Sequence, residues 1–387
     1  DSLVAMGWAR VTEDGHTIAL EKGAAQVTLE PGGQLEHAAR PVSRQEDLVA
    51  DVRAYLAQVA VPSRKLGLAW LAIGFRPFGT IDQVPWMPKQ RYAVMREFLP
   101  PRGHLAPEMM KRTATVQVNL DYADADDAKE KLRCVMSITS VLTALYACSP
   151  IVDEAVSGFQ SYRSFVWTAT DPARCGLLPL AFSDGDVFRN YAEWALDVPM
   201  FFLYRGTYRA LDGRTFRQFA RDGFEGHRAT MDDWELHLST LFPEARLKRF
   251  LEVRGCDAGS LEMNVALGPL CRGLLYDATA RSAATDLTAE LDMDQRIEFW
   301  HRVARQGLAA RVPGRRGITA GELGRELCAI ATDGLSRLAP EEDSYLDPVR
   351  AIAESGRTQA DAIIELWHQS GGDRAQIIAE LCHRGLG

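Results

Sequence analysis

Strict alternation of apolar and polar side chains over residues 113–122 is the feature that most constrains how this chain folds. Apolar side chains occupy every second position of the segment TATVQVNLDY, namely Ala114, Val116, Val118, Leu120 and Tyr122. A period of two sustained over the whole segment predicts a β-strand with one face on a hydrophobic core. The other face carries short hydrogen-bonding groups, on Thr113, Thr115, Gln117, Asn119 and Asp121. Two interpretations stay open: an ordinary half-exposed strand, or a strand that lines a polar cleft.

The composition is that of a globular protein. The chain has 387 residues, of which 47% are apolar and 25% charged, so it is long enough to bury a substantial core. A net charge of −8 argues against a nucleic-acid partner. The longest apolar runs, such as residues 66–75, are too short to span a bilayer, so we expect no membrane partner and interpret that run as a buried strand.

The cysteines indicate neither a zinc site nor a disulfide framework. All seven are dispersed, and none forms a CxxC pair. An odd, scattered set is typical of reduced thiols, so we expect a cytoplasmic protein.

Strand and helix signals are segregated along the chain. Residues 26–30, 113–122 and 249–257 alternate as strands, whereas helical spacing dominates from residue 266 onward. This order predicts an α+β fold with an antiparallel or mixed sheet. We expect a sheet-and-helix core over residues 1–265 and a helical part over residues 266–387, packed on the same domain. In the first part, residues 44–60, 89–99 and 124–148 have helical spacing, and residues 158–171 are expected to be partly extended.

The polar faces of these strands combine acids, amides and cations. They offer Glu30, Glu36, Gln117, Asn119, Asp121, Glu252 and Arg254. Carboxylate and amide oxygens suit Mg²⁺ or Mn²⁺ with a phosphate-bearing substrate. An arginine at position 254 can bind a phosphate or carboxylate through two hydrogen bonds, and Arg163 and Lys248 add positive charge. Surface ion pairs are the alternative explanation for each charge taken singly. Together, the strands favour an enzyme that uses ATP.

Six longer motifs occur in order along the chain. They are LEPGGQLE (29–36), PWMPKQRYAVM (85–95), MMKRTATVQVNLDY (109–122), GFQSYRSFVWTATDPARCGLLP (158–179), YAEWALDVPM (191–200) and DWELHLSTLFPEARLKRFLEVRG (233–255). Together they resemble glutamate–cysteine ligase of the plant and proteobacterial type. The resemblance extends from about residue 7 to the C-terminal helices.

The resemblance implies a fold and a reaction. The fold is a mostly antiparallel sheet curved into a funnel with helices packed outside, as in glutamine synthetase-like carboxylate–amine ligases. The reaction joins the γ-carboxylate of glutamate to the amine of cysteine through an acyl phosphate, with ATP and Mg²⁺ (or Mn²⁺), as the first step of glutathione-type thiol biosynthesis. The expected partners are these small molecules, and the expected state is a monomer or homodimer.

The resemblance also implies roles for individual residues. Glu30, Glu36, Gln117 and Glu252 are expected to bind the metal. The ATP-binding set is expected to be Gln117, Asn119, Lys248 and Arg254. Catalytic roles fall to Arg254 at the ATP phosphates and to Arg163, in the SYRS motif, as an anion-binding arginine.

Two departures from the family pattern motivate alternatives. Trp194 and Phe201 stand where tyrosines are common, so a related ATP-dependent ligase with a different amine or acid is the second hypothesis. An early strand with paired metal-binding glutamates is not visible, and we expect it to be missing upstream. Its absence motivates a third hypothesis, a non-catalytic homologue.

Overall fold

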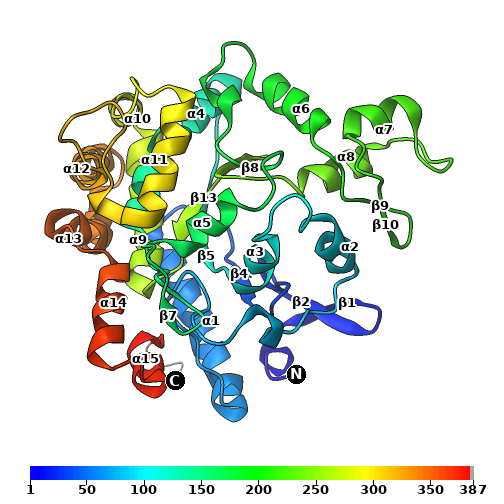
Figure 1. The fold of residues 1–387 in the computed structure, drawn as a ribbon, viewed down its shortest axis with the longest axis horizontal. Coiled ribbons are helices and arrows are strands. Elements are labelled where there is room, and N and C mark those ends of the chain that lie inside the picture. The colour runs from blue at the N-terminus through cyan, green and yellow to red at the C-terminus, as the bar shows by residue number, and fades with distance from the viewer. Residues whose placement is uncertain (384–387) are drawn as a thin grey trace.

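The computed structural model describes residues 1–383, and Figure 1 shows the arrangement of its elements. The N-terminal segment is a four-stranded antiparallel meander of β1 (Ala9–Glu13), β2 (His16–Lys22), β3 (Ala25–Leu29) and β4 (Leu35–Ala38). The PGG turn joins β3 to β4, and in it a Cβ on Gly32 would lie 2.0 Å from the Lys111 carbonyl oxygen. Only glycine fits there, so the β3–β4 hairpin lies directly against α3 (Ala106–Arg112).

The central sheet contains the alternating segment with which the sequence analysis began. Its three antiparallel strands have the order β12 (Ala245–Leu247), β13 (Leu251–Asp257), β5 (Thr115–Leu120). Val116, Val118 and Leu120 of β5 and Leu251 and Val253 of β13 belong to or pack against the main hydrophobic core. The alternation therefore predicted both the strand and its apolar face correctly.

Helix α4 (Ala125–Leu145) packs on this core, and later helices surround it. The Asp124 side chain caps its start by accepting a hydrogen bond from the Asp127 N–H. In Figure 1 the C-terminal helices, yellow to red, lie together on one side of the molecule. They are α9 (Leu261–Tyr276), α10 (Ala278–Asp286), α11 (Met293–Gln306), α12 (Ala320–Leu338), α13 (Asp347–Ser355), α14 (Gln359–Gln369) and α15 (Arg374–Leu381).

The remaining elements lie between these parts in sequence. The helices are α1 (Gln45–Leu66), α2 (Gln90–Phe98), α5 (Tyr162–Thr168), α6 (Val187–Asp197), α7 (Phe216–Asp222) and α8 (Met231–Leu238). The strands are β6 (Ile151–Val152), β7 (Ala155–Val156), β8 (Cys175–Gly176), β9 (Phe202–Tyr204), β10 (Tyr208–Ala210) and β11 (Phe242–Pro243).

The apolar run at residues 66–75 is not a strand, and that prediction was wrong. Helix α1 extends to Leu66 and ends at Gly67, whose φ of 64° is left-handed. Beyond it, only isolated bridges form at Leu71 and Phe75. Ile73 and Phe75 are nevertheless buried, so the apolar composition indicated burial and not backbone conformation. Part of residues 158–171, expected to be extended, is likewise the helix α5.

The fold combines helices with antiparallel sheets, as expected. Within residues 1–383 the strands form several separate small sheets, and only β8 and β11 pair in parallel. The single curved funnel and the domain boundary at residue 265 stay predictions. Within residues 1–383, no helix is both long and apolar enough to cross a membrane.

Candidate active site

The polar faces of the N-terminal and central sheets meet around Glu36 of β4. Its side chain is open to solvent, yet the surrounding protein desolvates the carboxyl and raises its pKa. The charge of Glu30 raises this pKa further, and Arg254 of β13 lowers it. The Glu36 carboxyl therefore experiences the charges of residues from both sheets.

A cluster of cations surrounds Glu252 of β13. Its Oε2 lies 2.7 Å from Arg246 Nε and 2.8 Å from Arg254 Nη1, and its Oε1 lies 3.4 Å from Lys248 Nζ. Burial alone would raise the pKa of Glu252, but the charges of Arg254 and Arg246 outweigh it and lower the pKa to about 2. Three cations around one carboxylate leave surplus positive charge, which suits a phosphate group.

The Glu30 carboxylate is fixed in place by groups from two elements. Thr28 Oγ1 donates a hydrogen bond to it at 3.0 Å, and the Tyr92 hydroxyl of α2 donates a longer one at 3.4 Å. Lys89 Nζ lies 4.0 Å away. The PGG turn that follows Glu30 returns the chain so that the Glu30 charge acts on Glu36.

Gln117 and Asn119 lie on the face of β5 opposite to the core. Asn119 pairs directly with Glu252 of the neighbouring strand. Within residues 1–383, neither amide side chain makes a hydrogen bond, Asn119 is exposed and Gln117 is half-buried. Both amides are therefore free to bind a ligand beside the cation cluster.

The comparisons with known proteins identify the family. The family model described as glutamate-cysteine ligase family 2 matches residues 8–381. The chain is 38% identical to the chloroplastic glutamate–cysteine ligase of Medicago truncatula over 365 residues, which cover 93% of this chain and 71% of that protein. The Arabidopsis thaliana chloroplastic enzyme is also 38% identical, over 377 residues that cover 96% and 72%.

The chain belongs to glutamate–cysteine ligase family 2. A crystal structure of a Francisella tularensis glutamate–cysteine ligase in complex with AMP has a similar fold, with a TM-score of 0.59. The match covers 92% of this chain and 80% of that one at 12% identity, so it bears on the fold alone.

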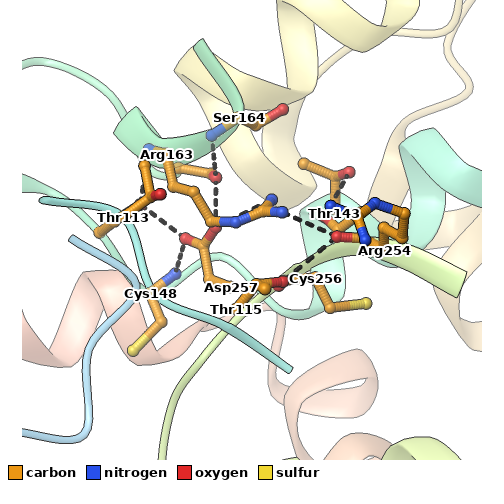
Figure 2. Close-up of polar contacts among 12 residues, drawn as sticks. Thr113, Thr115, Thr143, Cys148, Arg163, Ser164, Arg254, Cys256 and Asp257 are labelled. Atoms are coloured by element: carbon orange, nitrogen blue, oxygen red, sulfur yellow. Dashed lines mark hydrogen bonds and ion pairs between the residues drawn. The ribbon is translucent and has the colours of Figure 1, made fainter. Parts of the chain in front are cut away.

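Arg163 is buried near the start of α5, and its expected role as an anion-binding arginine stays a prediction. Its side chain is 2% exposed, and its Nη2 donates a hydrogen bond to the main-chain carbonyl of Arg254 at 2.7 Å. Its Nη1 lies 3.9 Å from Asp257 Oδ1 (Figure 2). Within the described residues, Arg163 Nε and Nη1 are buried and have no hydrogen-bond partner.

The expected metal ligands fit a divalent cation unequally. The charge of Glu30 raises the pKa of Glu36, as expected for carboxylates that a cation would bring together, and the Gln117 amide oxygen is free. Glu252 fits poorly, because both of its oxygens already contact cations. Within residues 1–383, no group of three His, Cys, Asp or Glu side chains is arranged to hold a metal.

The sequence analysis missed Arg246, which contacts Glu252, and Lys89 and Tyr92, which lie beside Glu30. Arg246 pairs directly with Glu252 across the β12–β13 hairpin. The sequence signal for Arg246 is its spacing of two residues from Lys248, which predicts both cations on one face of a short strand before a turn. Lys89 and Tyr92 lie in the PWMPKQRYAVM motif, but nothing in that motif indicates that it contacts Glu30.

Proposed function

We propose that this protein joins the γ-carboxylate of glutamate to the amine of cysteine with hydrolysis of ATP to ADP, as the first step of glutathione-type thiol biosynthesis. The carrying observation is membership of the ligase family over nearly the whole chain, at 38% identity to relatives of which it covers about 71%. The cation cluster on the β12–β13 hairpin supports the proposal, because the reaction transfers a phosphoryl group.

Arg254, Arg246 and Lys248 bind the phosphates of ATP in this proposal. A γ-carboxylate oxygen of glutamate attacks the terminal phosphorus, ADP leaves, and negative charge is spread over the transferred phosphoryl oxygens. Glu252 holds the cations in one geometry before the nucleotide binds. The cysteine amine then attacks the acyl carbon and releases phosphate, so the enzyme needs no covalent nucleophile.

Glu30, Glu36 and the Gln117 amide would hold Mg²⁺ or Mn²⁺, which would neutralise phosphate charge when bound. Lys89 lies 4.0 Å from Glu30 and balances part of the acidic charge. Asn119, exposed beside Glu252, is placed to donate a hydrogen bond to the nucleotide.

The hypothesis of a different amine or acid loses part of its motivation in the structure. Phe201 is 1% exposed and packs edge-on against Phe98, with ring centroids 4.7 Å apart. Trp194 is half-buried and packs against the main core. Packing against the hydrophobic core therefore explains both aromatic residues that depart from the family pattern. The cytoplasmic location and the monomeric or dimeric state stay predictions, and the plant relatives are named as chloroplastic.

The test is ADP release measured with glutamate, Mg²⁺ and a panel of amines. We expect release to require glutamate, cysteine and Mg²⁺ together and to yield γ-glutamylcysteine in equal amount by mass spectrometry. Preference for another amine would support the second hypothesis. Absence of release under all conditions would support a non-catalytic homologue, and release without any amino acid would contradict the ligase proposal.

A further inference from the structure

Tyr191 of α6 has a buried hydroxyl that makes no hydrogen bond within the fold. The residue is 5% exposed and belongs to the main hydrophobic core, where its ring meets Trp194 edge-on with centroids 5.0 Å apart. Among the described residues, no group donates a hydrogen bond to its oxygen or accepts one from it. Because leaving a buried hydroxyl unpaired destabilises a fold, a hydroxyl in this state indicates a group that binds there during function.

The cation cluster of the β12–β13 hairpin surrounds this hydroxyl. Burial raises the pKa of Tyr191, whereas the charges of Arg246 and Arg254 lower it and the charge of Glu252 raises it. Burial likewise lowers the pKa of Arg246, and Tyr191 is one of the groups that oppose this shift. The hydroxyl therefore lies within the electrostatic range of the cluster, although it comes from a different element.

The geometry of the hairpin agrees with this position. Strand β12 is at the edge of the central sheet, and the Lys248 N–H donates a hydrogen bond to the Phe250 carbonyl at 2.8 Å. Hydrogen-bonded and non-hydrogen-bonded pairs alternate along an antiparallel ladder, so Leu247, opposite Leu251, directs its N–H away from β13. This N–H also lowers the pKa of Tyr191, which indicates that the tyrosine lies at the free edge of β12.

The proton of this hydroxyl has no acceptor among the cations. Arginine and lysine side chains only donate hydrogen bonds. Glu252 is the carboxylate of the cluster, and its oxygens contact Arg246, Arg254 and Lys248 but not Tyr191. An anion held by the two arginines would bring oxygen atoms that can accept the proton. A phosphate group suits this position, because the cluster has surplus positive charge.

We propose that the Tyr191 hydroxyl donates a hydrogen bond to a phosphate group of ATP that Arg246 and Arg254 bind. The proposal rests on the proposed function, because it takes the cation cluster as the site of the nucleotide phosphates. The hairpin contributes charge to this site, and α6 contributes a neutral, directional donor. The phosphate is then held from two elements and not from the hairpin alone.

The experiment is calorimetric titration of ATP with Mg²⁺ into wild type and Tyr191→Phe, which removes the hydroxyl and keeps the ring. We expect ATP affinity and kcat/KM for ATP to fall about 10- to 100-fold, as for the loss of a hydrogen bond to a charged group. The melting temperature without nucleotide should equal or exceed that of wild type, because an unpaired buried group is removed. Unchanged ATP affinity, or a lower melting temperature, would overturn the proposal.

Tyr146→Phe is the matched control. Tyr146 is also a buried tyrosine of the main core, and its hydroxyl makes no hydrogen bond within residues 1–383. Burial raises its pKa, and the groups that act on it are the thiols of Cys256, Cys271 and Cys328, not cations. This variant should keep the wild-type ATP affinity. Equal losses in Tyr146→Phe and Tyr191→Phe would overturn the proposal, because the effect would then follow from removing any buried hydroxyl.

Binding and turnover are measured separately, so the two proposals can fail separately. A wild-type protein that binds ATP more tightly than Tyr191→Phe but forms no γ-glutamylcysteine would contradict the proposed function and support the phosphate contact. Equal ATP affinity and equal ligase activity in wild type and Tyr191→Phe would contradict the phosphate contact alone. A wild-type protein that does not bind ATP would overturn both.

Discussion

At the residue scale, the Glu252 carboxylate explains why three cationic side chains lie close together without a bound phosphate. Its carboxylate contacts Arg246, Arg254 and Lys248, and the side chain is only 6% exposed. A buried carboxylate with one cation removed still has two partners, so the site should survive single substitutions. The contribution of each cation to phosphate binding can therefore be measured in a variant that still folds.

Arg254→Ala is expected to weaken transition-state binding by about 3–5 kcal/mol, because a desolvated phosphate would lose a paired charge. The readout is kcat/KM for ATP, with the melting temperature as a check on folding. Exposed Arg325→Ala on α12 is the control and should retain wild-type kinetics. An unchanged kcat/KM for Arg254→Ala would remove this arginine from the site.

His237 on α8 makes folding stability depend on pH. It is 2% exposed, its Nε2 contacts the Ala195 carbonyl at 2.8 Å, and burial lowers its pKa to about 4. Between pH 6.5 and about pH 4, His237 is protonated in the unfolded chain but neutral in the folded protein. Stability contributed by neutral His237 should therefore be complete above pH 7 and decline by about 3 kcal/mol as the pH falls to 4.

The measurement is the free energy of unfolding in urea at several pH values. His237→Gln should be less stable than wild type at pH 7.5, and the difference should shrink toward pH 4.5. His104→Gln, which alters an exposed histidine, should keep the wild-type slope. Parallel curves for wild type and His237→Gln would contradict this account.

At the element scale, regular periodicity was predictable and local irregularity was not. The alternation of β5 and the apolar stripe of α4 were read correctly, because each repeats over several turns or residue pairs. The bulge in β13 adds a single residue and leaves no periodic signal. The hydrogen bond from Arg163 to the Arg254 carbonyl lies at this bulge, so this contact was not predictable either.

The two faces of β5 should respond differently to substitution. Gln117→Ala and Asn119→Ala are expected to lower activity or raise the Mg²⁺ requirement with little loss of stability, because neither amide is bonded within the described residues. Val118→Ala, on the core face, should instead lower the unfolding free energy by about 1–3 kcal/mol and leave the kinetics of the folded fraction intact.

Melting temperature and steady-state kinetics at several Mg²⁺ concentrations separate the three variants. Earlier melting of Gln117→Ala or Asn119→Ala than of Val118→Ala, combined with normal kinetics, would place the proposed site on the wrong face.

At the scale of the whole molecule, the site is assembled from segments that are far apart in sequence. Glu30 and Glu36 come from the N-terminal hairpin, Tyr92 from α2, and Glu252 and Arg254 from the central sheet. The residue types suggested polar, ligand-binding side chains in some of these segments, and the family resemblance indicated that those segments contribute to one site. Periodicity alone cannot place the hairpin, because its position depends on features such as the close approach of Gly32 to Lys111 of α3.

The central claim is that this protein activates glutamate as an acyl phosphate, and an oxygen-isotope experiment tests it most directly. Glutamate labelled with ¹⁸O in its γ-carboxylate is incubated with ATP, cysteine and Mg²⁺, and the released phosphate is analysed by mass spectrometry. The account predicts one ¹⁸O atom per phosphate, because the carboxylate oxygen that attacks the terminal phosphorus leaves with it. Formation of γ-glutamylcysteine with unlabelled phosphate would contradict the acyl-phosphate route, and unlabelled phosphate without this product would contradict the ligase assignment.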